Sequence, residues 1–479
     1  MTLPKTGTSK EAILESLEKY RENDTNWRSG RTWGYIFDAG KEAEEVAKAA
    51  YMMYLSENAL DPSVFPSLLR FENELVAMGK AHVNGGDDVV GSFTTGGTES
   101  ILLAVKTARD HNRKLKPHIT QPEMILPITA HAAFHKASHY LGVKVVAIGV
   151  DPVTFKANAD ELEGAITENT ILIVGSAPSY AHGVIDPIEE MVAIALRHEV
   201  LFHVDACMGG WLLPYFRRLG EDIPPFDFSV PGVTSLSMDL HKYAYAAKGA
   251  SLILYKNKEL RRSQIFSCAG WTGYSVVNPT IGSSKSGGPL AAAWAVLNFL
   301  GDDGYLELAR KKLECMKALV KGITAIPELR VLGNPQMSLV CFTSDVVDPF
   351  QVIDEMKVKG WYIQPQLAMG PSPKNIHLSI NASNTKWTEE LLVDLRTCVE
   401  IAKGIKDTGG PLAAMVRASF SNADPEQFGP ETFSQMLTMA GIKGVQLPGR
   451  MAEINEVMNA LPPRFRELLL IEFINELFC

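Results

Sequence analysis

One lysine stands where it could react with a carbonyl group. Lys242 comes shortly after the apolar run Ser235–Met238 and lies between His241 and Tyr243. A lysine that is withdrawn from water has a depressed pKa and becomes nucleophilic. The same position is also typical of a solvated lysine that caps a strand, so Lys242 by itself does not decide the chemistry.

An aspartate ends a second apolar run, LFHVD, at Asp205. The carboxyl end of a buried strand is where open α/β sheets bind their ligands. A buried carboxylate without a partner is costly, so Asp205 needs a cation beside it. A protonated pyridine nitrogen is one such cation. The alternatives are an ion pair with a nearby lysine and a cap on the following helix.

Two glycines open a helix in the segment TTGGTES, residues 94–100, which follows the apolar run VVGSF. At a helix start, Gly96 and Gly97 let backbone amides point at an anion, and the helix dipole and the Thr98 hydroxyl add to the attraction. The alternative is a tight turn in which Thr98 or Ser100 caps the helix.

A histidine begins the helical stretch HAAFHKASHY at His131. Its ring could stack on a planar ligand, although three histidines on a partly wet helix face are equally typical. His135 and His139 have the spacing of a metal pair, but no third ligand suggests itself, so we do not expect a metal.

Together these four features supply the parts of a pyridoxal 5′-phosphate site. They are a phosphate cradle, a ring stacker, an acid for the pyridine nitrogen and a lysine for covalent attachment. Their order along the chain and their placement at strand ends argue against coincidence.

An α/β framework is predicted to position them. Seven apolar runs rich in Val and Ile alternate with helical stretches, and they predict the strands VVGSF, MILPI, KVVAIGV, TILIVGS, LFHVD, SLSMD and SLILY. This pattern is typical of a mostly parallel sheet with helices on both faces. We expect an N-terminal helical segment (1–57), a large cofactor-binding domain (58–300), a smaller C-terminal α+β domain (301–404) and a helical extension (405–479).

Composition excludes several other classes. The 479 residues carry a net charge of −9, which disfavours a nucleic-acid partner. No apolar run approaches the roughly 18–20 residues that span a bilayer, and the N-terminus lacks the apolar core of a signal peptide. The six cysteines are scattered without a CxxC pair, which favours a reducing cytoplasm. Dinucleotide, P-loop, HExxH and GxSxG motifs are absent.

The motifs resemble those of the group II pyridoxal-phosphate decarboxylases of fold type I, and within them the sphingosine-1-phosphate lyases. The resemblance rests on GGTES, HAAFHKA, HVDACMGG, SLSMDLHKY with a second lysine six residues after the first, PSYAHGVIDP and NPTIGSSKSGG. It runs from about Asn58 to about residue 400.

The resemblance implies a role for each cofactor residue. Lys242 binds pyridoxal 5′-phosphate covalently, Asp205 pairs with its pyridine nitrogen, and His131 stacks on its ring. Gly97–Thr98 hold the phosphate, with His241 nearby.

The resemblance also implies residues that act beyond the cofactor of one chain. Gly282 and Ser283 belong to a loop that reaches the cofactor phosphate of the neighbouring subunit, which predicts a homodimer with shared sites. Tyr180 and Lys248 match positions that contact the substrate phosphate or assist proton transfer.

Two positions depart from the lyase pattern. Phe37 stands where the lyases usually have a tyrosine of the substrate-phosphate pocket, and Asp61 stands where they have a histidine. An added anion repels a phosphate dianion unless Asp61 pairs with Lys248 or binds another head group.

The implied reaction is the retro-aldol cleavage of a 2-amino alcohol, phosphorylated or not, to an aldehyde and an ethanolamine product. The alternative is decarboxylation of an L-amino acid on the same scaffold, which Phe37 and Asp61 favour and which Tyr180 and Lys248 oppose. A third possibility, a fold relative that only binds partners, is disfavoured because Lys242, Asp205 and His131 are all present.

Overall fold

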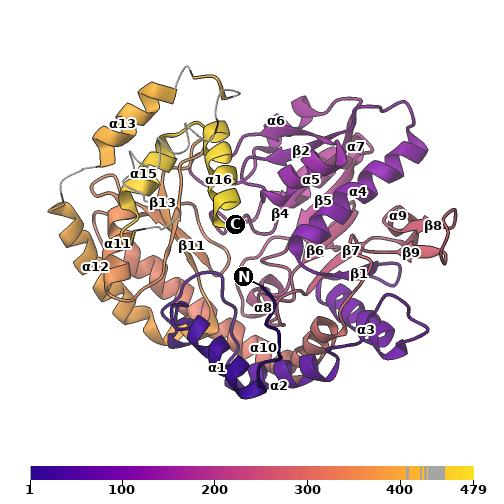
Figure 1. The fold of residues 1–479 in the computed structure, drawn as a ribbon. Coiled ribbons are helices and arrows are strands. Elements are labelled where there is room, and N and C mark those ends of the chain that lie inside the picture. Colours follow the sequence, from indigo (N-terminus) through magenta and orange to yellow (C-terminus); the bar gives the residue numbers. More distant parts are fainter. Residues whose placement is uncertain (1, 406–408, 421–422, 426–428, 430–447, 479) are drawn as a thin grey trace.

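The computed structural model describes residues 2–405, 409–420, 423–425, 429 and 448–478 (Figure 1). A seven-stranded sheet and a four-stranded sheet lie in separate parts of the molecule, each with its own helices. A two-stranded hairpin forms the third sheet.

The large sheet contains all seven predicted strands. Its order is β1-β7-β6-β5-β4-β2-β3, and of the described strands in it only β7 runs against the others. The strands are β1 (Val90–Thr94), β2 (Glu123–Pro127), β3 (Lys144–Ile148), β4 (Thr170–Ser176), β5 (Leu201–Asp205), β6 (Ser235–Met238) and β7 (Ser251–Tyr255). The expectation of a mostly parallel sheet is therefore confirmed.

Helices cover this sheet on both faces, as the apolar strands require. In β2, Met124 and Leu126 pack into one apolar cluster, whereas Ile125 between them packs into another, because successive side chains of a strand point to opposite faces. The helices between the strands and beside the sheet are α3 (Pro66–His82), α4 (Gly97–Leu115), α5 (Ala133–Leu141), α6 (Ala159–Ala165), α7 (Ile188–Arg197), α8 (Leu213–Arg218) and α9 (Lys258–Arg262).

A long helix, α10 (Gly287–Thr324), leads to the smaller sheet and has a kink at Gly301, whose φ is 59°. The smaller sheet is antiparallel in the order β10-β11-β13-β12. Its elements are β10 (Arg330–Val331), β11 (Leu339–Thr343), α11 (Pro349–Val358), β12 (Gln364–Gln366), β13 (Asn375–Ser379), η2 (Ala382–Trp387) and α12 (Thr388–Lys403). This arrangement confirms the predicted C-terminal α+β unit.

The N-terminal segment returns to the smaller sheet. It contains α1 (Lys10–Tyr20), η1 (Trp27–Ser29) and α2 (Lys41–Met53). Between η1 and α2, Trp33 is fully buried and its backbone N–H donates to the Tyr362 carbonyl oxygen at 2.8 Å. The stretch that holds Phe37 is thereby fixed against the C-terminal part of the fold.

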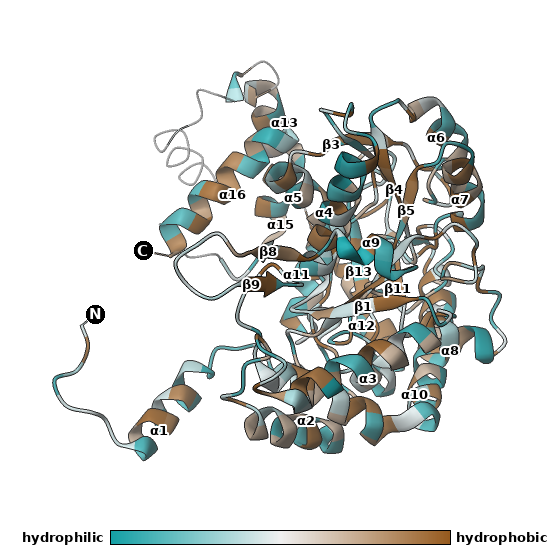
Figure 2. Cartoon of the chain, turned by 90° about the vertical axis from the view of Figure 1, so that its right-hand side faces the viewer, coloured by the Kyte–Doolittle hydropathy of each residue, from teal (hydrophilic) through white to brown (hydrophobic). Residues whose placement is uncertain are grey.

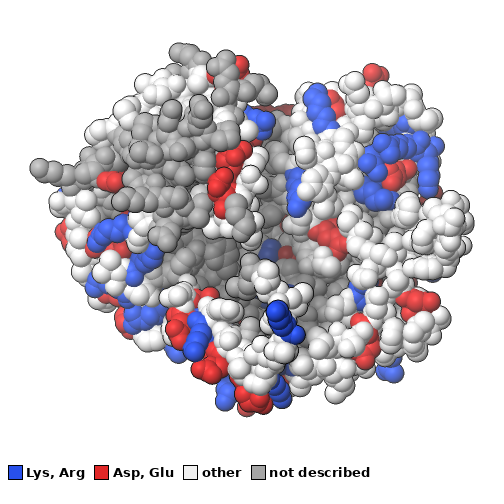
Figure 3. All heavy atoms as spheres, viewed as in Figure 1, with Lys and Arg blue, Asp and Glu red and all other residues white. Residues whose placement is uncertain are grey.

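The hairpin β8 (Phe266–Cys268) and β9 (Val276–Asn278), helix α1 and the C-terminal helix α16 (Pro463–Leu477) lie on the same side of the molecule (Figure 2). The other C-terminal helices are α13 (Gly409–Phe420) and α15 (Ala452–Ala460). Within the described residues, no helix has the length and apolar character needed to cross a membrane. Lys and Arg are interspersed with Asp and Glu over the face seen in Figure 3.

Candidate functional site

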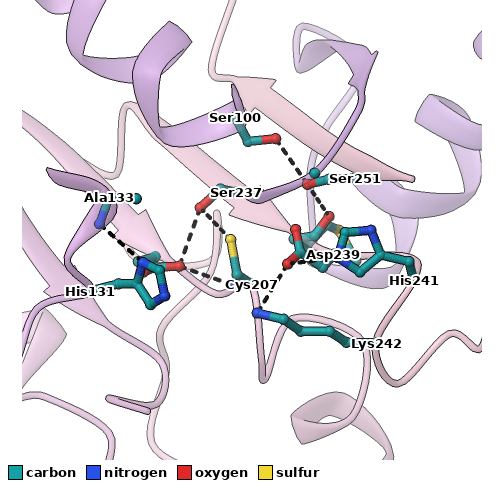
Figure 4. A network of polar contacts seen from close by, with 12 residues as sticks. Ser100, His131, Ala133, Cys207, Ser237, Asp239, His241, Lys242 and Ser251 are labelled. Atoms are coloured by element: carbon teal, nitrogen blue, oxygen red, sulfur yellow. Dashed lines mark hydrogen bonds and ion pairs between the residues drawn. The ribbon is translucent and has the colours of Figure 1, made fainter. Parts of the chain in front are cut away.

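The partly buried Lys242 ammonium and the buried Asp239 carboxylate form an ion pair just beyond the end of β6. Lys242 Nζ lies 3.0 Å from Asp239 Oδ2, and His241 Nε2 lies 3.5 Å from the same oxygen. In Figure 4 the Lys242 ammonium lies between His131 on one side and Asp239 and His241 on the other. Asp239 is a site residue that the sequence reasoning missed, although a carboxylate three residues before the lysine was a usable signal.

The predicted depressed pKa of Lys242 is wrong for the chain without cofactor. Burial disfavours its ammonium form, but the Asp239 carboxylate, helped by Cys207 and Asp205, more than offsets this, so the pKa of Lys242 is raised. The pKa of Asp239 is lowered, because Lys242 and His241 together outweigh the effect of its burial. The sequence did not predict this ion pair, and the ion pair determines that the pKa of Lys242 rises instead of falling.

Asp205 lies at the carboxyl end of β5, as predicted. It is 7% exposed, and its Oδ1 accepts hydrogen bonds from the Cys207 backbone N–H at 3.1 Å and the Ser237 hydroxyl at 3.4 Å. Among the described residues no donor reaches Oδ2. The neighbouring groups therefore orient this carboxylate and leave one oxygen for a ligand.

The glycine turn between β1 and α4 packs closely against Asp239, Cys207 and His241. A Cβ at position 97 would lie 2.8 Å from an Asp239 oxygen and 2.9 Å from the Cys207 sulfur, and one at position 96 would lie 3.2 Å from the His241 ring. Gly97 and Thr98 are the first residues of α4, so their amides have no partner within the helix. The turn can thus hold an anion beside His241.

His131 and Tyr180 line one cavity of about 350 Å³. His131 accepts the Ala133 backbone N–H at its Nδ1, 3.1 Å away, which fixes the ring at the start of α5. The Tyr180 hydroxyl donates to Gln364 Oε1 at 2.8 Å. Burial raises the pKa of Tyr180, so it stays a neutral phenol near pH 7.

Lys248 brings a second cation to the site. Its Nζ donates to the carbonyl oxygens of Tyr35 and His241, each at 3.3 Å, and lies 4.8 Å from the centre of the Phe37 ring. Surrounding protein, and then the charge of Lys242, lower the pKa of Lys248 to about 8. Lys248 therefore changes between its ammonium and its amine form near pH 8.

Gly282, Ser283 and Asp61 lie apart from these groups within one chain. Ser283 and Asp61 line a different cavity, of about 690 Å³, and Gly282 lies beside Ser283. Asp61 accepts hydrogen bonds from the backbone N–H and hydroxyl of Ser63, at 2.8 and 2.6 Å. The suggested pairing of Asp61 with Lys248 is not seen between these described residues.

The residues present fit pyridoxal 5′-phosphate. The free oxygen of Asp205 is an acceptor for a protonated pyridine nitrogen, and the first amides of α4, at Gly97 and Thr98, can donate to a phosphate. The two lysines supply an amine for the aldehyde and a further cation.

Two family models match the chain. "Pyridoxal-dependent decarboxylase conserved domain" matches residues 65–345, and "Pyridoxal-dependent enzyme, C-terminal putative HTH domain" matches residues 411–476. The first match includes every predicted site residue except Phe37 and Asp61.

Known proteins similar to this chain include sphingosine-1-phosphate lyases. The chain is 43% identical over 399 residues to a sphingosine-1-phosphate lyase of Arabidopsis thaliana, covering 82% of this chain and 72% of that protein. The solved sphingosine-1-phosphate lyase of Burkholderia pseudomallei superposes with a TM-score of 0.81 at 37% identity, covering 88% of this chain and 95% of that one. Glutamate decarboxylase of Lactobacillus brevis shares the fold, with a TM-score of 0.74 at 19% identity over 85% and 96% of the two chains.

The ion pair predicts the reactivity of Lys242 without cofactor. Asp239→Asn removes the carboxylate that favours the ammonium, so the pKa of Lys242 should fall. Each unit of that fall raises the neutral, reactive fraction about tenfold below the pKa. The measurement is the rate of reductive methylation of Lys242 in the cofactor-free chain between pH 7 and 10, followed by peptide mass spectrometry. Asp205→Asn, whose carboxylate also favours the ammonium but more weakly, should give a smaller increase. An unchanged rate in Asp239→Asn would contradict the assignment.

Proposed function

This chain belongs to the pyridoxal-dependent decarboxylase family and is a lyase-like member of it, and on that premise we propose that it cleaves a phosphorylated 2-amino alcohol into a fatty aldehyde and phosphoethanolamine. The reaction breaks the bond between C2 and C3 of the substrate. The likeness to sphingosine-1-phosphate lyases over most of the chain supports a long-chain base as the substrate class.

One observation carries the choice between cleavage and decarboxylation. Lys248 places a second ammonium within reach of the ion pair, and its pKa of about 8 keeps this group mostly charged at neutral pH. A phosphorylated substrate needs such a cation, whereas removing carbon dioxide from an amino acid requires no cation for a substrate phosphate. Lys248 therefore favours the phosphorylated amino alcohol.

The geometry of the site supports a role for each of the proposed cofactor residues. We assign covalent binding of the cofactor to Lys242, the pyridine nitrogen to Asp205, the ring face to His131, and the phosphate to Gly97–Thr98 with His241 beside them. When bound, pyridoxal 5′-phosphate supplies a sink for the electrons of the broken carbon–carbon bond.

The chain's own groups handle the protons. Lys248 Nζ holds a proton that it can give to C2 of the product, or it keeps that proton and binds the substrate phosphate. Tyr180 stays protonated and directs its hydroxyl hydrogen to Gln364, so its oxygen is left to accept a hydrogen bond from the substrate. Lys242 is the other candidate proton donor to C2.

A homodimer with shared sites completes the proposal. Exposed apolar side chains gather on the elements that share one side of the molecule in Figure 2. They are Ile13, Leu14, Leu17 and Tyr20 on α1; Phe266, Trp271, Tyr274, Val277 and Ile281 on or beside the β8–β9 hairpin; and Leu470, Ile471 and Ile474 on α16. A second copy that covers this side would bring the loop of Gly282 and Ser283 toward the partner's site. The free thiols of the described cysteines agree with a cytoplasmic location.

The first test is the identity of the products. Incubation of the holoenzyme with a phosphorylated long-chain base should yield a fatty aldehyde and phosphoethanolamine by mass spectrometry. A panel of L-amino acids, incubated separately, should yield no amine. Amines from the panel without aldehyde from the base would establish the decarboxylase instead.

The pKa of Lys248 predicts how substrate affinity depends on pH. Its ammonium is present below pH 8 and is lost above it, so the KM for the phosphorylated base should rise as pH passes about 8. Lys248→Arg keeps the charge and should remove this rise, because arginine stays protonated. The measurement is KM between pH 6.5 and 9.5 for both enzymes. If KM stays flat and kcat alone changes, Lys248 moves a proton and does not bind the phosphate.

Phe37 and Asp61 predict weak activity on sphingosine-1-phosphate, through poor affinity for its phosphate. A tyrosine and a histidine there would each donate a hydrogen bond to phosphate, worth roughly 1.5–3 kcal/mol. Phe37→Tyr with Asp61→His should therefore lower KM by about a hundredfold or more. Steady-state kinetics of both enzymes test this, with Phe37→Tyr alone as the control. An efficient wild type that the double variant does not improve would show that other groups bind the phosphate.

Shared sites predict complementation between two inactive variants. Lys242→Ala removes the reactive amine, and Ser283→Trp blocks the loop that serves the partner. Mixing equal amounts should restore roughly a quarter of the wild-type turnover, because half the dimers are hybrids with one intact site each. Two affinity tags verify that hybrids form. Inactive hybrids, or a fully active monomer at low concentration, would rule out the shared site.

A further inference from the structure

The Glu99 carboxylate connects the phosphate turn proposed for its own chain with the loop proposed to serve the partner's site. Its Oε2 accepts hydrogen bonds from the Thr95 backbone N–H at 2.7 Å and the Thr95 hydroxyl at 2.8 Å. Its Oε1 accepts the backbone N–H of Ile281 at 2.8 Å. Thr95 belongs to the turn that holds the phosphate of its own chain, and Ile281 adjoins Gly282 and Ser283.

A charged carboxylate at the position of Glu99 has an unfavourable free energy. Glu99 is 8% exposed, and in the described part of the chain it has no ion-pair partner. It also lies in the first turn of α4, beside the amides assigned to a phosphate, where a second anion is repulsive. Three donors and the positive end of the helix stabilise its charge. The turn itself could be capped by a neutral side chain, so the charge points to a different requirement.

The position of Glu99 requires a side chain that can accept a hydrogen bond at each of its two terminal atoms. Thr95 and Ile281 each present a backbone N–H to Glu99, from opposite ends of its carboxylate. A glutamine of the same size has one acceptor oxygen and one amide nitrogen, so it can satisfy only one of these two backbone donors. A carboxylate is the one side chain of this length that can accept from both.

The loop depends on this contact. Its far end is anchored by Lys285, whose Nζ lies 2.6 Å from Glu72 Oε2 and whose backbone N–H donates to Asn58 Oδ1 at 2.9 Å. Between Thr280 and Ser284, Glu99 is the only group outside the loop that makes a hydrogen bond with it, among the described residues. Ile281 itself is 57% exposed, so side-chain packing does little to hold this stretch.

We propose that Glu99 is a positioning residue that holds the loop for the partner's cofactor and the phosphate turn of its own chain in one arrangement. The proposal rests on the shared-site dimer proposed above. Each protomer then uses one carboxylate to shape two sites, its own through Thr95 and its partner's through Ile281. Loss of Glu99 should weaken cofactor binding in both.

Hybrid dimers separate the two effects. One protomer, the loop protomer, carries Lys242→Ala, so covalently bound cofactor in the hybrid reports only on the site of the other, the reporter protomer. That site is built from the phosphate turn of the reporter protomer and the 280–284 loop of the loop protomer.

Glu99→Ala is placed in either protomer alone. Cofactor affinity is measured by equilibrium dialysis and the absorbance of bound cofactor, without any assay of turnover. Both placements should weaken binding by about tenfold, as expected for loss of one hydrogen bond to a charged group.

Matched variants make the result specific. Glu189→Ala removes another first-turn glutamate, in α7, and should leave affinity unchanged in either protomer. Glu99→Gln keeps the size and one acceptor, so it should give a smaller loss, and it replaces Glu99→Ala if that variant does not fold. Amide hydrogen exchange of the cofactor-free dimers adds a direct measure, because Ile281 should lose protection in Glu99→Ala.

Each outcome decides the proposal. Weakening only when Glu99→Ala is in the reporter protomer would mean a local cap on the phosphate turn and would overturn the cross-subunit role. Ser283→Trp in the loop protomer identifies the source of a failure. If it weakens the reporter site while Glu99→Ala in the loop protomer does not, Glu99 is not the positioning residue. If neither variant in the loop protomer has an effect, the shared site itself is wrong, and the role of Glu99 is excluded with it.

Discussion

The ion pair between Lys242 and Asp239 constrains the rest of the site. Two opposite charges withdrawn from water are stable only if their geometry is held closely. Here the chain after the lysine is tied down from the smaller sheet, because the Tyr243 hydroxyl lies 3.3 Å from the Ser338 carbonyl oxygen and 3.1 Å from that of Ile380. The large sheet supplies the carboxylate, and the smaller sheet keeps the lysine against it. The cofactor site therefore depends on both parts of the fold.

The same packing gives the two lysines of the site opposite properties. Lys242 has a carboxylate in contact, so its pKa is raised despite burial. Lys248 touches only carbonyl oxygens and the face of Phe37, which do not offset its partial desolvation and the charge of Lys242, so its pKa falls to about 8. Phe37 in turn packs edge-on against Tyr243, with ring centres 5.0 Å apart. One aromatic residue thus packs beside the neighbour of the first lysine and lies against the second lysine itself.

The sequence predicts the framework well because its strands are buried on both faces. Continuous apolar runs such as TILIVGS leave few other structures open, and all seven became strands of one sheet. Local sequence could also place Asp205 and Gly97 at element ends. It could not predict the sign of the Lys242 pKa, because that sign depends on how closely Asp239 approaches in the folded chain. Within one chain, Asp61 lines a cavity other than that of His131 and Tyr180, and its place in a substrate pocket stays a prediction. Alignment with a motif assigns a residue to a pocket without saying which protomer's pocket.

The placement of Asp61 then bears on substrate choice. Residues 57–59 are hydrogen-bonded to the end of the 279–286 loop, through Ala59 N–H to the Lys285 carbonyl at 2.7 Å and Gly287 N–H to the Glu57 carbonyl at 2.8 Å. Asp61 and Ser283 therefore lie near one another and line one cavity. If these residues face the partner's site, Asp61 presents its negative charge to a substrate bound mainly by the other protomer. Phe37, which lies beside Lys248 in the same protomer, acts from the opposite side. The two departures from the lyase pattern would then meet only across the dimer interface, and substrate specificity would be a property of the dimer.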